Sequence, residues 1–201
     1  SPLAVLITAI GVSYLLQSVA LMLTEGKPKM LNLALGAITA GKFYVKWSTI
    51  ITIICTVIVM VSLTLFVKKT KTGRAMVAVS EDKGAARLMG INVNFIIMIT
   101  FAIGSALAAL AAFCYLLSTP SVVPTMGAIP GIKAFTAAVI GGIGSIPGAM
   151  LGGILLGLVE SISYKITVIA PYTDAIEFAI LIVILLVRPN GFVGKKRREK
   201  V

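Results

Sequence analysis

The sequence predicts an all-α fold, a polytopic bundle of transmembrane helices in a lipid bilayer. Three observations predict it. Of the 201 residues, 58% are hydrophobic and 12% are charged, whereas an average soluble domain is roughly 45–50% apolar. The charged residues gather between long apolar runs, and Lys and Arg outnumber Asp and Glu by 18 to 7. Basic loops between apolar segments are typical of membrane proteins.

The same composition excludes several classes of function. A nucleic-acid partner would need a basic patch on a folded polar surface, and the chain has no soluble segment to carry one. With no histidine and seven carboxylates, it also lacks the parts of a His-based catalytic triad or metal site. Cys55 and Cys114 lie in apolar runs, where we expect small hydrophobes and no disulfide. We therefore expect no catalytic residues, metal or cofactor.

The first half of the chain predicts three membrane spans. A span needs about 20 mainly apolar residues, and Leu3–Leu23, Ser48–Val67 and Phe95–Leu117 meet that length. Thr24–Trp47 is interrupted by charges and is predicted to be an exposed loop. Lys68–Asn94 is the longest polar connection and is expected to be a cytoplasmic loop.

The second half is less regular. Ser118–Lys133 is rich in Pro and Gly and cannot be helical throughout. Ala134–Ser163 is apolar but broken by glycine and proline, and Ala175–Val187 predicts the last helix. Residues 189–201 form a basic tail, and we treat residues 1–201 as one membrane domain.

Charge sidedness predicts the path of the broken segment. The positive-inside rule places the two densest basic clusters in the cytoplasm. These are Lys68, Lys69, Lys71 and Arg74 in the loop, and Lys195, Lys196, Arg197, Arg198 and Lys200 in the tail. An even number of crossings must separate them, so Ala134–Ser163 must supply two short crossings or a re-entrant hairpin. Thr24–Trp47 and Ser118–Lys133 then lie outside.

The glycine-rich break is the first candidate functional motif. Gly144, Gly148 and Gly152 are spaced by four residues, as on one helical face, and would let helices approach closely. Broken helices in transporters gather near substrate paths, whereas the ladder alone is also compatible with ordinary membrane packing. The predicted break and pathway-packing residues are Gly141, Gly142, Gly144, Ser145, Pro147, Gly148 and Gly152.

The second motif lies in the predicted cytoplasmic loop and indicates a short helix. Ser80 would be its N-cap, Glu81 and Asp82 would favour the helix dipole, and Gly90 could close it in the left-handed conformation. Ala85, Ala86 and Met89 are expected to form a small apolar face. Such a face predicts a protein partner, with a helix lying on the membrane surface as the alternative.

Three stretches carry a resemblance to a known family. They are Thr72–Met76, the loop segment from Glu81-Asp82 to Leu88–Asn92, and the glycine-rich string Lys133–Ala149. Together they resemble the LivH-type permeases of bacterial branched-chain amino acid ABC importers. The resemblance runs from the first span to the tail.

The resemblance implies a multi-pass protein of the bacterial cytoplasmic (inner) membrane. Its implied partners are a second homologous permease, two cytoplasmic ATP-binding subunits and a periplasmic or lipid-anchored solute-binding protein. It also implies that the loop couples to the ATPase, through Glu81, Asp82, Ala85, Ala86, Leu88, Met89 and Gly90. Family members are longer at the N-terminus, so we expect this chain to lack the first helices.

A few charged residues inside apolar segments are ambiguous. Glu160 is a candidate for the substrate path or lies near the outer interface. Lys133 could meet a substrate carboxylate, although an interfacial lysine is the simpler interpretation. Asp174 and Glu177 suit the start of the last helix.

The function predicted from the sequence is half of a translocation pathway for branched-chain or related small amino acids. ATP would be hydrolysed in separate subunits, because Gly141–Ser145 lacks the lysine of a Walker-type phosphate loop. The main alternative is a self-sufficient secondary carrier or channel, for which Glu160 is the one plausible coupling group. A membrane scaffold that transports nothing is disfavoured by the broken glycine segment.

Overall fold

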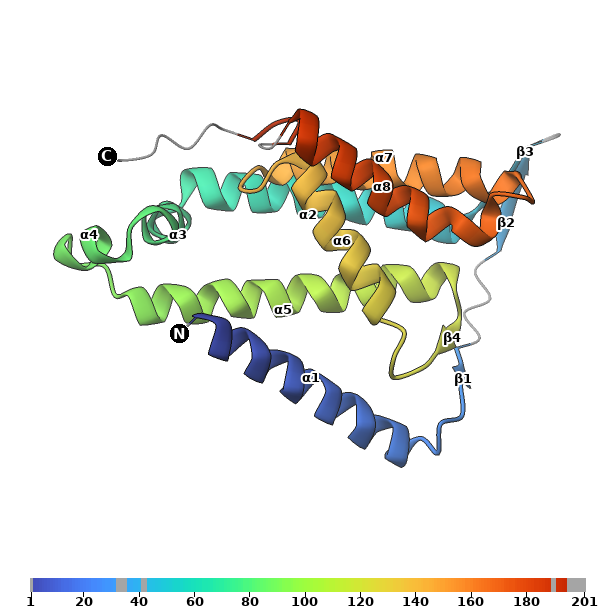
Figure 1. Ribbon diagram of the computed structural model, residues 1–201, viewed down its shortest axis with the longest axis horizontal. Coiled ribbons are helices and arrows are strands. Elements are labelled where there is room, and N and C mark those ends of the chain that lie inside the picture. Colours follow the sequence, from blue (N-terminus) through green and yellow to red (C-terminus); the bar gives the residue numbers. More distant parts are fainter. Residues whose placement is uncertain (1, 32–35, 41–42, 189–190, 195–201) are drawn as a thin grey trace. The chain divides into compact units, whose positions relative to one another are not determined.

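The computed structural model describes residues 2–31, 36–40, 43–188 and 191–194 (Figure 1). The basic cluster predicted at residues 195–200 lies outside them. The chain forms two compact units: Ser1–Cys55 with Ala102–Ala128, and Thr56–Phe101 with Ile129–Val201.

The first unit contains helix α1, four short strands and parts of two long helices. The bounds are α1 Pro2–Leu23, β1 Lys29–Met30, β2 Ala37–Ala40, β3 Phe43–Lys46, α2 Trp47–Lys69, α5 Val93–Ser118 and β4 Ser121–Val122. Strands β2 and β3 pair antiparallel, with Ala37 opposite Lys46 and Ala40 opposite Phe43. Strands β1 and β4 also pair antiparallel.

The prediction of an exposed loop over Thr24–Trp47 is therefore wrong in part: nearly all of its described residues with an assigned burial are exposed, but the segment contains the strands β1, β2 and β3. The charges exclude a membrane span there, but β-branched and aromatic residues such as Ile38, Tyr44 and Val45 favour extended pairing. The β1–β4 pairing is extended by the Leu31 N–H, which donates to the Pro120 carbonyl at 2.8 Å. Such long-range pairing of two-residue strands has no clear signal in the sequence.

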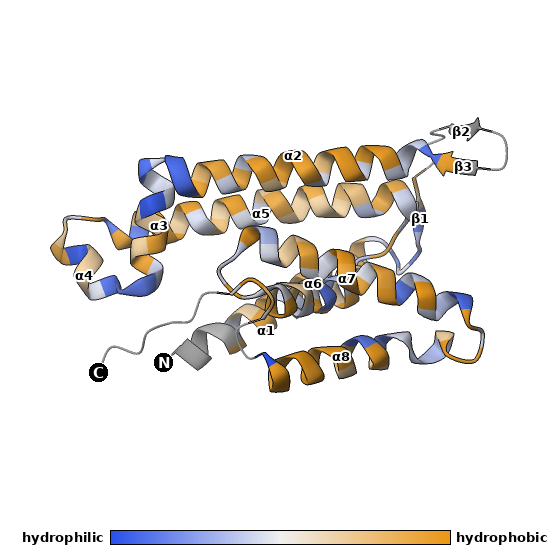
Figure 2. Cartoon of the chain, turned by 90° about the horizontal axis from the view of Figure 1, so that it is seen from above, coloured by the Kyte–Doolittle hydropathy of each residue, from blue (hydrophilic) through white to orange (hydrophobic). Residues whose placement is uncertain are grey.

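Within the part of the chain that the structure describes, four helices are long and apolar enough to cross a membrane. They are Trp47–Lys69, Val93–Ser118, Ile146–Lys165 and Ala170–Val187. Two other apolar helices are shorter: Ile7–Leu23 of α1, which lies within the predicted first span Leu3–Leu23, and helix α6, Ala128–Gly141. In Figure 2 the spans are predominantly hydrophobic along their length. Large apolar side chains remain exposed around them, which is the surface a bilayer or a partner subunit would cover.

The polar connection in the second unit forms two helices, α3 (Lys71–Glu81) and α4 (Lys83–Leu88). The break falls at Asp82, whose Oδ1 accepts from the Gly84 N–H at 2.8 Å and the Ala85 N–H at 3.0 Å. The N-cap is thus Asp82, and the prediction of Ser80 is wrong. The Ser80 hydroxyl instead donates to the Val77 carbonyl at 2.7 Å, inside α3. A carboxylate that accepts two N–H groups is the stronger cap.

The end of α4 agrees with the prediction for Gly90. Its φ of 79° is left-handed. The Ile91 N–H donates to the Ala86 carbonyl at 3.0 Å, and the Gly90 N–H to the Arg87 carbonyl at 3.0 Å. This pair of bonds is a Schellman closure, so the loop has a defined shape at both ends of α4.

The predicted apolar face of the loop helix is wrong in one residue. Ala86 is 4% exposed and packs in a buried cluster with Val79, Val93 and Ile96. Ala85 and Met89 are exposed. The alanines differ because adjacent helical residues point about 100° apart. Ala86 therefore holds the loop together.

The rest of the second unit is a three-helix assembly of α6, α7 (Ile146–Lys165) and α8 (Thr173–Val187), with a short 3-10 helix at Ala170–Tyr172. Its buried core contains Ala137, Ile140 and Leu156, against which apolar residues of α8 pack. Helix α6 begins six residues before the predicted Ala134, because proline and glycine are tolerated in a first helical turn.

Helices α6 and α7 are joined by a tight turn at residues 142–145, inside the predicted break. The turn uses positive φ at Gly142 (107°) and Gly144 (93°). Ser145 caps α7 by accepting the Gly148 N–H at 3.1 Å, and Pro147 follows in the first turn. Gly144 is thus a turn residue, so the prediction that it shares a helical face with Gly148 and Gly152 is wrong.

Backbones of α6 and α7 touch at glycine. A Cβ on Gly148 would overlap the Gly141 carbonyl, a Cβ on Gly141 would overlap Gly148, and one on Gly152 would overlap the Ala137 carbonyl. Position 141 faces 148 and position 137 faces 152, so the helices run antiparallel. Only hydrogen side chains permit this approach.

The segment after α8 returns to the same turn. The N–H groups of Phe192 and Val193 donate to the carbonyls of Ile140 and Gly141, both at 3.0 Å. These are the last carbonyls of α6, which have no helical partner because the helix stops there. The chain after α8 thereby satisfies the end of α6.

We predict that Gly148→Ala destabilises the protein whereas Gly157→Ala, on the same helix, does not. A methyl group at 148 meets backbone, but nothing lies within 4 Å of a Cβ at 157. Overpacking costs about 1–3 kcal/mol, and alanine gains about 1 kcal/mol of helix propensity over glycine. Thermal unfolding in detergent measures both; equal midpoints for the two variants would contradict the backbone contact.

A second prediction compares adjacent alanines in the loop. Ala86→Glu should expose the loop to limited proteolysis, since a charge without a partner would be buried among Val79, Val93 and Ile96. Ala85→Glu should leave the cleavage pattern unchanged because residue 85 is exposed. The same pattern for both glutamate variants would show that Ala86 is not part of a buried cluster.

Candidate functional site

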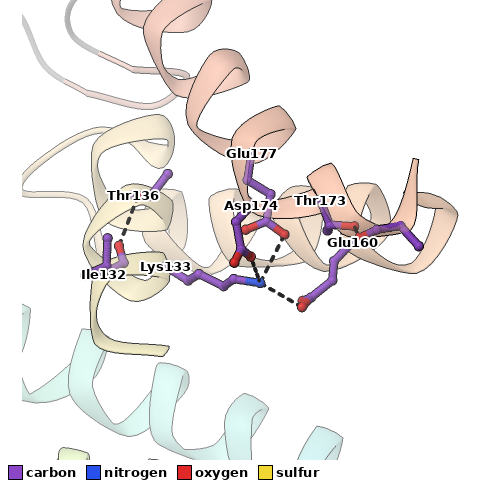
Figure 3. Close-up of polar contacts among 8 residues, drawn as sticks. Ile132, Lys133, Thr136, Glu160, Thr173, Asp174 and Glu177 are labelled. Atoms are coloured by element: carbon purple, nitrogen blue, oxygen red, sulfur yellow. Dashed lines mark hydrogen bonds and ion pairs between the residues drawn. The ribbon is translucent and has the colours of Figure 1, made fainter. Parts of the chain in front are cut away.

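Three carboxylates of the α6–α8 assembly converge on Lys133. Its ammonium lies 2.8 Å from Glu160 Oε1, 3.0 Å from Asp174 Oδ1 and 3.4 Å from Glu177 Oε1. Figure 3 shows the lysine reaching from α6 between a carboxylate of α7 and two of α8. We call these four residues the Lys133 cluster. It ties three helices together through one side chain.

The four side chains of the Lys133 cluster differ widely in how exposed they are. The side chain of Glu177 is 1% exposed and that of Lys133 19%, whereas those of Glu160 and Asp174 are 36% and 53% exposed. Glu177 Oε2 is buried without a hydrogen-bond partner in the described structure. A charged oxygen left unpaired in a dry environment is costly. Its location beside an ammonium group lowers that cost without removing it.

The charges in the cluster do not cancel. One ammonium faces three carboxylates, which leaves two negative charges when all four groups are ionised. Among the described residues, no group of three His, Cys, Asp or Glu side chains is arranged to hold a metal ion. The chemistry that the four side chains of the cluster offer is ion pairing and hydrogen bonding.

The sequence points to these residues singly and gives no sign of their association. Glu160 reads as an isolated carboxylate and Lys133 as an interfacial lysine, whereas the structure joins them directly. Asp174 and Glu177 do lie in the first turns of α8 as predicted. The available signal was that isolated charges within apolar helices are costly unless they pair; their separation in the sequence hid which ones do.

The cluster and the glycine turn lie at opposite ends of the three-helix assembly. Lys133 is in the second turn of α6, Glu160 is near the end of α7 and Asp174 begins α8. The turn at 142–145 joins the other ends of α6 and α7. From Ile146 to Glu160, α7 rises about 20 Å. The predicted break residues are thus not part of the charged site.

The predicted coupling residues form a separate group around α4. Ala86 belongs to the buried cluster with Val79, Val93 and Ile96, distinct from the core of α6 to α8. Leu88 is 91% exposed and Met89 82% exposed. Glu81 ends α3, Asp82 caps α4, Ala85 is exposed and Gly90 follows the helix. The exposed apolar surface is thus formed by Leu88 and Met89.

Comparisons of the sequence with known proteins all point to one family of membrane transport proteins. Residues 3–185 match the family described as "Branched-chain amino acid transport system / permease component". The chain is 42% identical over 98% of its length to the high-affinity branched-chain amino acid transport system permease protein BraD of Pseudomonas aeruginosa, covering 66% of that protein. It is 42% identical over 99% of its length to LivH of Escherichia coli K12, also covering 66% of that protein.

A more distant relative is a probable branched-chain amino acid transport permease protein, LivH, of Methanocaldococcus jannaschii, 33% identical over 69% of this chain and 45% of that protein. No solved structure matches the chain. The chain spans about two thirds of the length of its bacterial relatives. The apolar helices show a multi-pass membrane protein. Because the family model covers residues 3–185, the chain belongs to the family of branched-chain amino acid transport permease components.

Proposed function

We propose that the chain belongs to the permease subunit of an ATP-driven importer of branched-chain or related small amino acids. The carrying observation is the family match over residues 3–185. In this proposal the permease supplies half of the translocation pathway and performs no chemistry on the solute. It works in a bacterial cytoplasmic membrane.

A complete importer of this kind also needs partner subunits. A second homologous permease completes the pathway, two cytoplasmic ATP-binding subunits hydrolyse ATP, and a periplasmic or lipid-anchored protein delivers the solute. Exposed apolar residues around the spanning helices support contact with lipid and with another membrane subunit. The names of the relatives support the transport system itself.

The loop of α3 and α4 is proposed to couple the permease to its ATPase. Leu88 and Met89 are among the most exposed apolar side chains of the described structure. An apolar pair at the end of a polar loop is costly in water and suits a groove on a partner. In this proposal residues 81–90 have the coupling role that the resemblance implies, and Leu88 and Met89 form the surface that contacts the ATPase.

The structure suggests how a push on this loop would reach the membrane. Val79 of α3, Ala86 of α4 and Val93 and Ile96 at the start of α5 form one buried cluster. Because packed cores transmit displacement rather than absorb it, movement of α4 would shift the beginning of α5. Helix α5 continues as a membrane span.

The alternative of a self-sufficient carrier is supported by the charges that the Lys133 cluster places on apolar helices, because ion-coupled carriers need such groups. The exposed Leu88 and Met89 favour the ATP-driven importer, since a carrier that works alone has no use for a docking surface. ATP dependence separates the two: uptake driven by an ion gradient without ATP would support the carrier.

We predict that Leu88→Asp reduces co-purification of the ATP-binding subunits and solute-stimulated ATP hydrolysis in the complete complex. The residue is 91% exposed, so the change does not disturb the fold, but a charge placed in an apolar contact costs several kcal/mol. Leu88→Met retains the apolar surface and should behave like the parent.

Both variants should reach the membrane in parental amounts. Leu88→Asp complexes that assemble and hydrolyse ATP at the parental rate would contradict the docking assignment. If Leu88→Met loses both the co-purification of the ATP-binding subunits and the stimulated ATP hydrolysis, the docking assignment is also contradicted, because methionine preserves the apolar contact.

A further inference from the structure

Helices α2 and α3 meet at a sharp bend that is one residue long (Figure 1). Helix α2 ends at Lys69, α3 begins at Lys71, and Thr70 between them is extended, with φ −87° and ψ 154°. The Thr70 hydroxyl donates to the Phe66 carbonyl of α2 at 2.6 Å and accepts the Gly73 N–H of α3 at 2.9 Å. One side chain therefore satisfies backbone groups at the end of one helix and at the start of the next.

The backbones of α2 and α3 are in contact at Gly73. A Cβ at this position would overlap the Phe66 carbonyl and would lie 2.5 Å from the Val67 Cα, whereas packed carbon atoms are normally about 3.5–4.0 Å apart. Gly73 lies inside α3 and has no positive φ, so glycine is required there by lack of space. Because the backbones touch, α3 cannot tilt closer to α2, and the two hydrogen bonds of Thr70 oppose tilting away.

The far end of α3 is packed against α4 and the start of α5. Val79 of α3 belongs to the buried cluster of Ala86, Val93 and Ile96, and Met76, one turn earlier in α3, packs against it. The cluster makes α3, α4 and the start of α5 one packed body, and the bend joins that body to α2. Movement of α4 would therefore reach two membrane spans: α5 through the buried cluster, and α2 through the bend.

We propose that the bend between α2 and α3 is a rigid elbow that carries the ATPase-driven movement of the coupling loop to α2. The elbow is formed by Phe66, Val67, Thr70 and Gly73. This inference rests on the proposed function. Thr70 and Gly73 are positioning residues, which act by fixing the direction of α3 relative to α2. A flexible joint would absorb a push on the loop, whereas a rigid elbow delivers it to the membrane span.

The distance across the elbow during the ATP cycle tests its rigidity without relying on transport. In the purified complete complex, with Cys55 and Cys114 replaced by alanine, spin labels are placed at Val61 of α2 and Val77 of α3, which are both 44% exposed. The distribution of distances between the labels should be the same without nucleotide and with ATP and orthovanadate. A distribution that shifts between the two states shows a hinge and would overturn the proposal.

Two variants of the elbow test its part in coupling. In proteoliposomes, Gly73→Ala and Thr70→Val should each lower the leucine imported per ATP hydrolysed about tenfold, because overpacking or loss of the cap shifts the elbow among orientations. The ATP-binding subunits should still co-purify, since Leu88 and Met89 are unchanged. Thr70→Ser keeps the hydroxyl, and Gly157→Ala adds a methyl group where nothing lies within 4 Å. Both of these controls should behave like the parent.

Parental import per ATP in both Gly73→Ala and Thr70→Val would overturn the elbow. Loss of the ATP-binding subunits from both variants would overturn it as well, because the bend would then serve docking and not transmission. If Gly73→Ala does not reach the membrane, the comparison of Thr70→Val with Thr70→Ser decides, and equal import by these two refutes the elbow. The parent complex separates the two proposals: a parent that imports no amino acid with ATP refutes the proposed function, whereas a parent that imports leucine no better than the variants refutes the elbow alone.

Discussion

The close approach of two helix backbones at the glycine turn determines how α6 and α7 pack against each other. Gly141 and Gly148 leave no room for a side chain between α6 and α7. Where helices are surrounded by lipid, such contacts replace the hydrophobic effect as the source of association. The turn would leave the last carbonyls of α6 unsatisfied, and the N–H groups of Phe192 and Val193 satisfy two of them. Backbone irregularity at membrane depth is tolerated when protein supplies the missing partners.

The opposite end of the α6–α8 assembly is held together by ion pairs rather than by contact between backbones. Lys133 contacts carboxylates from two neighbouring helices, and the partial burial of the group strengthens each interaction while raising its desolvation cost. Glycine contacts fix one end through geometry, whereas ion pairs at the other end respond to any charged group that enters.

Much of the fold was predictable because length and apolarity alone define a membrane span. Ser48–Val67 and Phe95–Leu117 lie within α2 and α5, and Gly90 adopts the left-handed conformation that its position suggested. The strands within residues 24–47 were not predictable, since their pairing depends on distant residues such as Ser121. The choice of Asp82 over Ser80 as the cap depended on where the chain bends, a tertiary property.

The candidate sites were predictable to different degrees. Glu160 was identified because a lone carboxylate in an apolar helix needs a reason, but its partner Lys133 is 27 residues away. The burial of Ala86 required knowledge of its neighbours in α3 and α5. A charged residue in an apolar helix can be recognised from the sequence because burying it without a partner costs free energy. Which residue becomes its partner depends on how the helices pack.

The most direct test of the account is the sidedness of the two ends of the α6–α8 assembly. In a background with Cys55 and Cys114 replaced by alanine, single cysteines can be placed at Ile143 in the turn, Val193 after α8 and Tyr172 near the Lys133 cluster, which are 76%, 44% and 65% exposed. A membrane-impermeant thiol reagent on intact cells should label position 172 and should label positions 143 and 193 only after permeabilisation. Labelling of 143 and 193 on opposite sides of the membrane would contradict the hairpin and the site built on it.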